Sequence, residues 1–379
     1  MKQVKAIAHN INTPILGCIT FKKKNIFNRK NYIYVCKGKT TRPSGFLTVI
    51  TDMVIDTNLS YINGIEDFTV FKEGDIISIS PLGEIIFHYE HASKHNALFV
   101  TERCNHRCIM CPQPPVAEEK DKTEFNLKLI SLFDKNTHSI GITGGEPTII
   151  GDSLFDIIHQ IKKKCPNASI DMLSNGVKFA NWEYAARMAR CNFKDFQIDI
   201  PLFSDIAEEH NRIVGAKTFY KTVQGIYNLA RLNQHIGIRI VVHKQTYKRL
   251  PQLADYIYHN FPFVCQVAFL QMETTGLANK NLKDLWIDPF DYNKQLEEAI
   301  MLLNDRGIPV YIYNAQLCVL PKQLRKFAMQ SITDWKEGFL SECNECKLKN
   351  KCAGVFTTNG SHISKYIRKI KCSESCTEC

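Results

Sequence analysis

The chain has 379 residues, of which 44% are hydrophobic and 23% are charged, and its formal net charge is +10. This length exceeds a single minimal core and predicts two or three domains. No apolar run approaches the roughly 18 residues of a membrane span, and polar residues interrupt any signal-peptide core near the start. We therefore expect a soluble cytoplasmic protein without a membrane partner. A nucleic-acid partner is not expected either, because the lysine runs 22–24 and 162–164 resemble solvated surface.

The fifteen cysteines indicate metal or cluster ligation. The cytosol keeps thiols reduced, and an odd number cannot pair fully within one chain, so a disulfide scaffold is disfavoured. Nine of the fifteen fall into three tight groups at positions 104/108/111, 343/346/352 and 372/376/379.

Three regions follow one another along the chain. Residues 1–95 carry short β-type runs and predict a β-rich N-terminal domain. Residues 96–310 alternate apolar strands with amphipathic helices, which predicts a partial (β/α)6 TIM-like barrel of the α/β class. Residues 311–379 add a strand and then become polar, basic and rich in cysteine. The six barrel strands are expected at 97–103, 139–145, 169–175, 196–202, 237–243 and 267–272, with helices at 127–134, 152–164, 182–190, 216–232 and 292–304.

A C-x3-C-x2-C motif stands at the end of the first barrel strand. Cys104, Cys108 and Cys111 lie on one short loop, and three thiolates on a cubane leave one iron with an open position. Barrel active sites lie at the carboxyl ends of strands, where this motif is placed. A structural zinc site is the alternative, but zinc usually takes four protein ligands.

The second barrel strand ends in Gly144-Gly145-Glu146-Pro147. Two glycines permit a ligand to approach the backbone closely, and Glu146 offers a carboxylate. Because the carboxyl ends of neighbouring parallel strands meet, this motif and the cysteine motif are expected at the same edge.

Together, CNHRCIMC and GGEPT resemble the radical S-adenosylmethionine (SAM) superfamily over roughly residues 96–310. The resemblance implies that Cys104, Cys108 and Cys111 bind a [4Fe-4S] cluster and carry catalysis, and that Gly144, Gly145 and Glu146 contact the SAM amino group. It also implies that Ser174 and Asn175, in LSNG, contact the SAM carboxylate or ribose. The residue before the third cysteine is usually aromatic in that superfamily; here it is Met110, whose thioether can still pack against the adenine.

Strand periodicity adds two candidates. In FQIDIPL the apolar Ile198, Ile200 and Leu202 share one face, so Asp199 is expected to point into the barrel, where it could bind ribose hydroxyls. By the same parity Arg239 points inward, and a buried guanidinium needs an anion such as the SAM carboxylate. A salt bridge at the strand end is the alternative for Arg239.

The C-terminal region offers a second ligand set. Cys343, Cys346 and Cys352 lie close in sequence, and Cys318 is a possible fourth ligand. Four thiolates fit an auxiliary [4Fe-4S] cluster, which would transfer or store electrons, and equally a structural zinc. Resemblance to the twitch and SPASM extensions of radical SAM enzymes favours the cluster. The final Cys372, Cys376 and Cys379 have no assigned role.

Several strings resemble the His-Xaa-Ser system radical SAM maturase family HxsC. They are LFVTERCNHRCIMCPQPP, HNRIVGAKTF, METTG, LWIDPFDY, YNAQLCVLP, and SITDWK followed by CNECKLKNKCAG. The resemblance implies an oxidoreductase that cleaves SAM reductively to a 5'-deoxyadenosyl radical and modifies a ribosomally made precursor peptide. Its expected partners are that peptide, an electron donor such as flavodoxin or ferredoxin, and a second radical SAM maturase.

Two other readings stay open. One is a radical SAM enzyme that acts on a small molecule or an RNA base, and the other is an iron-sulfur or zinc protein without turnover. We further expect the N-terminal β-domain to present a sheet edge or groove to an extended peptide.

Overall fold

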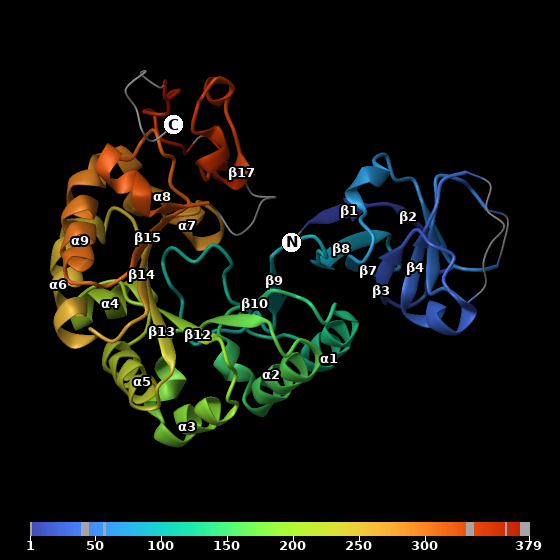
Figure 1. The fold of residues 1–379 in the computed structure, drawn as a ribbon, viewed down its shortest axis with the longest axis horizontal. Coiled ribbons are helices and arrows are strands. Elements are labelled where there is room, and N and C mark those ends of the chain that lie inside the picture. The colour runs from blue at the N-terminus through green and yellow to red at the C-terminus, as the bar shows by residue number, and fades with distance from the viewer. Residues whose placement is uncertain (1, 39–44, 56–57, 331–336, 361, 372–379) are drawn as a thin grey trace.

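The computed structural model describes residues 2–38, 45–55, 58–330, 337–360 and 362–371. Two eight-stranded sheets dominate the described chain, and a two-stranded sheet lies near its C-terminal end. Figure 1 shows the second sheet curved into an open half-barrel with helices on its outside, and the first sheet standing beside it.

The half-barrel sheet is parallel throughout. Its strand order is β16-β15-β14-β13-β12-β11-β10-β9, so neighbours in sequence are also neighbours in space. This arrangement follows from βα units whose crossovers all have one hand. The strands are β9 (His95–Phe99), β10 (Ser139–Thr143), β11 (Ser169–Leu173), β12 (Phe196–Pro201), β13 (His235–Val242), β14 (Gln266–Gln271), β15 (Val310–Tyr313) and β16 (Ala328–Met329).

Helices cover the outer face of this sheet and form the main core with it. Ile198, Ile200 and Leu202 of the β12 segment are fully buried on the helix side, which is the parity that the sequence predicts. The helices are α1 (Thr123–Leu132), α2 (Asp152–Lys164), α3 (Trp182–Arg190), α4 (Ala207–Val214), α5 (Phe219–Arg231), α6 (Leu250–Asn260), α7 (Gly276–Lys280), α8 (Leu282–Leu285) and α9 (Asn293–Asp305).

The predicted fold class is confirmed, with differences in detail. All six expected barrel strands are present, and two further parallel strands, β15 and β16, extend the sheet. The helices α2 and α3 occupy the expected residues 152–164 and 182–190. The helices α4 and α6 were expected only in general, as helical segments between strands, and no bounds were predicted for them.

The N-terminal sheet closes on itself. Its strands are β1 (Gln3–Lys5), β2 (Ile7–His9), β3 (Ile15–Thr20), β4 (Tyr32–Val35), β5 (Thr48–Ile50), β6 (Tyr61–Asn63), β7 (Ile76–Ile79) and β8 (Glu84–Tyr89), in the order β1-β8-β7-β3-β4-β5-β6-β2. The two outermost strands, β1 and β2, are separated only by Ala6, whose N–H donates to the Gly83 carbonyl at 3.0 Å. One continuous segment therefore joins both ends of the sheet around an apolar interior that includes Ile19, Ile33 and Ile77.

This closure corrects the expectation of a sheet edge for peptide binding. Among the described strands, β1 and β2 each pair on one side and are three residues long. An extended peptide needs a longer run of unpaired N–H and C=O groups. The alternative of a groove on this domain stays a prediction.

The N-terminal sheet packs on the half-barrel through Tyr89. Its ring stacks on Phe133 with centroids 4.6 Å apart, and its hydroxyl shares a hydrogen bond of 3.0 Å with that of Thr137. Leu16 and Ile76 join the same core cluster as the barrel residues. An aromatic pair of this kind is worth about 0.5–1.5 kcal/mol beyond the buried area.

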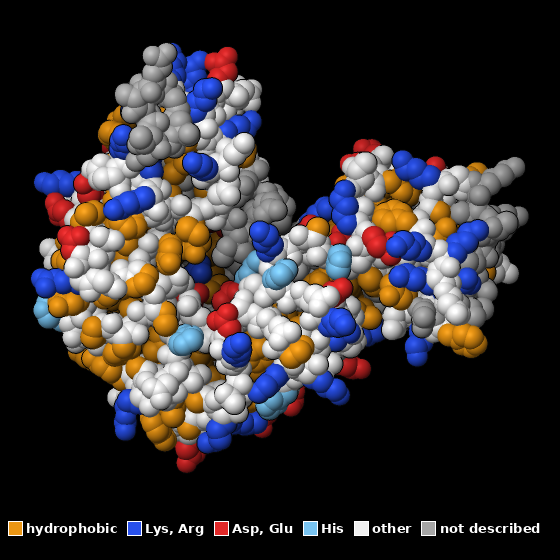
Figure 2. Space-filling view, in the orientation of Figure 1, with side chains coloured by type: hydrophobic (Ala, Val, Ile, Leu, Met, Phe, Trp, Pro, Cys, Tyr) orange, Lys and Arg blue, Asp and Glu red, His pale blue; other side chains and the backbone are white. Residues whose placement is uncertain are grey.

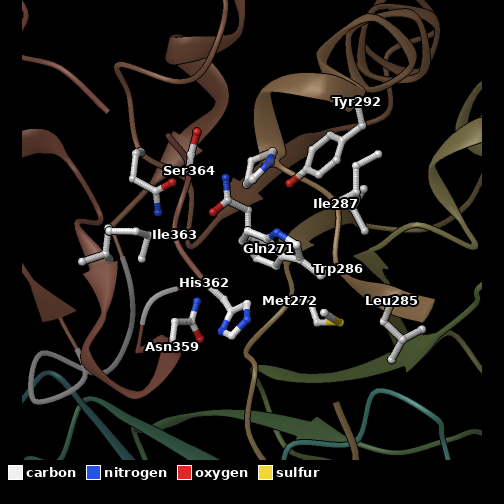
Figure 3. A pocket seen from close by; sticks show the side chains of 14 residues that line it. Gln271, Met272, Leu285, Trp286, Ile287, Tyr292, Asn359, His362, Ile363 and Ser364 are labelled. Atoms are coloured by element: carbon white, nitrogen blue, oxygen red, sulfur yellow. The ribbon is translucent and has the colours of Figure 1, made fainter. Parts of the chain in front are cut away.

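The C-terminal segment packs on the other flank of the half-barrel. Phe290 stacks on Tyr366 at 3.9 Å, and the Ser364 hydroxyl donates to Asp288 at 2.7 Å. Figure 3 shows the small pocket left at this junction, where Gln271 at the end of β14 lies close to Trp286 and His362. Within the described residues, no helix has both the length and the apolar content needed to cross a membrane.

Candidate functional site

The cysteine motif lies on the loop that follows β9, and two distant segments hold this loop. The Arg107 and Ile109 N–H groups donate to carbonyls at the end of α4, at 3.0 and 2.9 Å. From the other side, the Leu277 N–H donates to the Cys111 carbonyl at 2.8 Å, and the Asn281 side chain donates to the Ile109 carbonyl at 2.8 Å. The segment HNRIVG thus supplies the two carbonyl groups that accept hydrogen bonds from the cysteine loop. The segment METTG directly precedes Leu277, which donates to this loop.

The three thiols are close enough to interact electrostatically. The pKa of Cys104 is raised to about 11 and that of Cys108 to about 12, chiefly by burial and in smaller part by the neighbouring thiols. Burial also raises the pKa of Cys111. The Cys104 sulfur accepts the His106 N–H at 3.4 Å. Three half-buried thiols on one loop, with a backbone N–H directed at a sulfur, fit the ligand set of a cubane with one open iron.

The described residues contain no group of three or more His, Cys, Asp or Glu side chains arranged around a single metal ion. A cubane differs from such a site, because each cysteine binds a different iron. The three thiols are therefore considered as ligands of a cluster, with one iron for each cysteine, and not as ligands of a single metal ion.

Gly144 and Gly145 lie against the chain that leads into the cysteine loop. The Gly145 N–H donates to the Thr101 carbonyl at 2.7 Å, and the Glu146 N–H donates to the Arg103 carbonyl at 2.9 Å. A Cβ at Gly144 would lie 2.3 Å from the Thr101 oxygen, and one at Gly145 would lie 2.2 Å from the Arg103 oxygen. The two glycines are thus required by this close backbone contact, and their expected contact with SAM stays a prediction.

Replacing Gly145 by alanine should displace the backbone next to Cys104. The new methyl group would meet a carbonyl oxygen of the main chain, which cannot move aside as a flexible side chain can, so we expect a loss of about 1–3 kcal/mol of stability and a lower iron content after reconstitution. Asp156→Ala is the control, because Asp156 is exposed on α2, the helix that follows this strand end. Equal iron contents in the two variants would contradict the prediction.

Glu146 connects the ends of β10 and β11. Its side chain is 1% exposed, and burial raises its pKa. One carboxylate oxygen accepts from the Thr148 N–H at 3.0 Å, the Thr148 hydroxyl at 2.7 Å and the Ser174 hydroxyl at 2.8 Å. The other accepts from the Asn175 N–H at 2.6 Å. Protein donors thus use most of the acceptor capacity of this carboxylate, and its predicted contact with SAM stays a prediction.

Ser174 and Asn175 extend this connection to the cysteine loop. Both are buried, at 3% and 7% exposure. The Asn175 amide donates to the Asn105 side chain at 2.6 Å, and Asn105 directly follows Cys104. A continuous hydrogen-bonded path therefore runs from GGEP through LSNG to the cysteine motif. These motifs are far apart in sequence, and the structure brings them together.

The barrel interior carries a polar cluster. Asp199 points inward as expected and accepts from Gln197 at 2.8 Å and from Gln266 at 3.4 Å. Arg239 is half-buried and forms no ion pair among the described residues, so the salt bridge considered from the sequence is not found there. Its charge acts at longer range on Asp171 and Tyr313, whose pKa values burial raises.

Sequence reasoning missed Asp171, Tyr313 and His95 in this interior. The His95 ring nitrogen lies 3.6 Å from an Asp171 carboxylate oxygen. Strand parity was the available signal, since Asp171 alternates with the helix-facing Ile170 and Met172. Applied to every predicted strand, the period of two would have found Asp171 and Tyr313, whereas His95 precedes the strand predicted at 97–103.

Met110 is 4% exposed and packs in an apolar cluster with Phe203, Ile213 and Met272. It anchors the cysteine loop on α4 and on the end of β14. Its predicted contact with adenine stays a prediction, because little of its surface is open to a second ring.

The four C-terminal cysteines line one pocket. Cys318, Cys343, Cys346 and Cys352 share it with apolar side chains that include Phe339. The Leu317 and Gly354 N–H groups each lie 3.5 Å from the Cys352 sulfur, and the Ile370 N–H lies 3.4 Å from that of Cys346. Backbone donors around thiolates in an apolar pocket fit a fully ligated cluster.

Two predicted features lie outside the described residues. They are the string SITDWK, at 331–336, and the three final cysteines, Cys372, Cys376 and Cys379.

Part of the barrel is similar to a known protein family. Residues 98–257 match the family model of the Radical SAM superfamily, and this range runs from β9 into α6. Among relatives, an uncharacterized protein of Methanocaldococcus jannaschii is 27% identical over 234 residues, which are 59% of this chain and 75% of that protein. A GTP 3',8-cyclase of Desulforamulus reducens is 28% identical over 271 residues, which are 70% of this chain and 81% of the cyclase.

Among solved structures, SuiB of Streptococcus suis bound to SAM is similar with a TM-score of 0.47 and 16% identity. The match covers 60% of this chain and 51% of SuiB, so this chain spans about half of that protein. The residues that match the Radical SAM model include the cysteine loop, GGEP and LSNG.

Proposed function

We propose that this chain is a cytoplasmic radical SAM enzyme that binds a [4Fe-4S] cluster on Cys104, Cys108 and Cys111 and modifies a ribosomally made peptide as a His-Xaa-Ser system maturase. When bound, the cluster supplies the electron that cleaves SAM into methionine and a 5'-deoxyadenosyl radical. The observation that carries the proposal is the hydrogen-bonded path from Glu146 through Asn175 to Asn105, which fixes three strand-end motifs around the three thiols.

The chain's own residues bind and orient SAM in this proposal. The edge formed by Gly144–Glu146 and Ser174–Asn175 is the predicted site of the amino acid end of SAM. Arg239 faces the barrel interior with an unpaired charge, and a carboxylate is the anion that a half-buried guanidinium would bind. Asp199 is held in place by two glutamine amides and is the candidate acceptor for ribose hydroxyls.

The C-terminal pocket is the proposed site of an auxiliary [4Fe-4S] cluster. Burial raises the pKa of Cys318 and of Cys352, so their thiols bind iron only with loss of a proton. Four thiolates close the coordination sphere, which suits electron transfer rather than SAM binding. A structural zinc is the alternative occupant.

The peptide substrate is proposed from the family resemblance and from the arrangement of the segments that carry it. HNRIVG and METTG hold the cysteine loop, and YNAQLC and CNECKLKNKC build the C-terminal pocket. Figure 2 shows an open gap between the N-terminal sheet and the upper part of the half-barrel side of the molecule. A second maturase and a flavodoxin or ferredoxin are the proposed protein partners.

A nucleotide substrate is the second candidate. The GTP 3',8-cyclase relative aligns with 70% of this chain, which is more than the barrel alone. The family-model match covers only the barrel and does not distinguish between the two substrates.

One experiment separates these candidates. Reconstituted protein with SAM and a chemical reductant should form 5'-deoxyadenosine, and a peptide with His-Xaa-Ser repeats should change in mass when added. GTP in place of the peptide should stay intact, and this is read by mass spectrometry of both reaction mixtures. A modified GTP and an unchanged peptide would overturn the substrate assignment.

A further inference from the structure

A wide surface hollow lies on the outside of the half-barrel, away from the interior polar cluster. Helix α3, the turn before it, and the start of α5 form its walls, and Figure 1 shows α3 and α5 next to each other at the lower rim of the barrel. Asn105 and Thr148 line its inner end, and the aromatic side chains of Trp182 and Tyr184 line it as well. Trp182 is 43% exposed, and the Arg231 guanidinium lies 4.7 Å from the centroid of its ring.

The hollow carries a strong positive charge. Its lining includes Lys178, Arg187, Arg190 and Lys221, against the single carboxylate of Glu183. Arg187 is neutralised by its ion pair with Asp152. Lys178, Arg190 and Lys221 are exposed and form no ion pair with any described carboxylate. Three unpaired cations remain on one concave surface.

The inner end of the hollow reaches the proposed cluster site. Asn105 is exposed to the hollow and directly follows Cys104, and its side chain accepts from Asn175. Thr148, beside it, donates twice to Glu146. A protein seated in the hollow would therefore contact the residue next to a cluster ligand without entering the barrel, where SAM and substrate are proposed to bind.

We propose that this hollow is the docking surface for a small acidic electron-carrier protein of the flavodoxin class. This inference rests on the proposed function, since a reaction that consumes one electron per SAM requires a reductant. In the step concerned, the carrier is oxidised by one electron and the Cys104 site is reduced by one, and no bond is formed or broken. Complementary charge steers such encounters and orients the carrier, and the exposed Trp182 supplies apolar contact.

The test is a charge-reversal variant with a matched control. The variant is Lys178→Glu, Arg190→Glu and Lys221→Glu together. The control is Lys128→Glu, Lys163→Glu and Lys294→Glu, which changes the net charge equally at exposed residues on α1, α2 and α9. None of the six contacts a proposed SAM or cluster ligand. SAM cleavage is measured at low ionic strength with reduced flavodoxin and, separately, with dithionite.

With flavodoxin, the hollow variant should be slower than the parent by about tenfold or more, and the control should stay within about twofold. With dithionite, all three proteins should react alike, because the small reductant needs no docking surface. High salt should slow the parent with flavodoxin and remove the difference between the proteins.

Parental rates in the hollow variant with flavodoxin would overturn the docking surface. A parent that is inactive with dithionite would contradict the proposed function instead, and flavodoxin affinity of the three proteins, measured by titration, then tests the surface on its own. If the variant loses affinity for a short single-stranded RNA but keeps that for flavodoxin, the hollow binds nucleic acid and the inference is wrong.

Discussion

Protein with Cys104, Cys108 and Cys111 all replaced by alanine should form no 5'-deoxyadenosine after anaerobic reconstitution. The reason is that these thiols are the only proposed protein ligands of the cubane that has one iron with an open position. The parent should contain about eight irons, four in each of two cubanes, and the triple variant should keep about half. Iron and zinc are measured by elemental analysis, and 5'-deoxyadenosine by chromatography.

Cys265→Ala is the control, because Cys265 lies between α6 and β14, outside both cysteine groups. It should keep the iron content and the activity of the parent. If the triple variant cleaves SAM at the parental rate, the site assignment is wrong. Four irons and one zinc in the parent would instead make the C-terminal site a structural zinc site.

The fold of the half-barrel follows from local sequence patterns. Each strand is a short apolar run between helical segments, and parallel neighbours in sequence become neighbours in space because crossovers have one hand. Ile198 and Ile200 show the principle, since their alternation with polar residues correctly predicts the face toward the helices. The β-rich character of the N-terminal domain was also predicted correctly, but the closure of its sheet could not be predicted in this way. Its closure depends on Ala6 meeting Gly83, a contact between residues 77 positions apart that no periodicity encodes.

The candidate site was predicted as a set of motifs but not as a connected structure. Spacing and strand position place CNHRC, GGEP and LSNG at one edge of the sheet. The side-chain bond between Asn105 and Asn175 could not be foreseen, because it joins loops 70 residues apart. The two glycines illustrate the same limit. The sequence shows that backbone approach is needed there, while the structure shows that the approaching group is the carbonyl of Thr101 or Arg103.

Replacing Glu146 should have the largest effect on stability of any single change in the site. Alanine at this position leaves the Thr148 and Asn175 N–H groups without their acceptor in a buried environment. Each unsatisfied buried donor costs about 1–3 kcal/mol, so we expect a loss of about 3 kcal/mol or more. In a domain of this size that lowers the midpoint of thermal unfolding by about 6–12 °C, as measured by circular dichroism.

Glu146→Gln and Glu298→Gln complete the series. The glutamine at 146 keeps one acceptor oxygen but turns an amide N–H toward a protein donor. Glu146→Gln should therefore lose about 1–3 kcal/mol of stability, so that its stability lies between that of the parent and that of Glu146→Ala. Glu298 is exposed on α9, and its replacement should change the free energy of unfolding by no more than about 0.5 kcal/mol. Since the carboxylate joins β10 to β11, both substitutions at 146 should also lower the iron content of the cysteine loop. An unchanged unfolding midpoint in Glu146→Ala would show that the hydrogen bonds of this carboxylate do not hold the strand ends together.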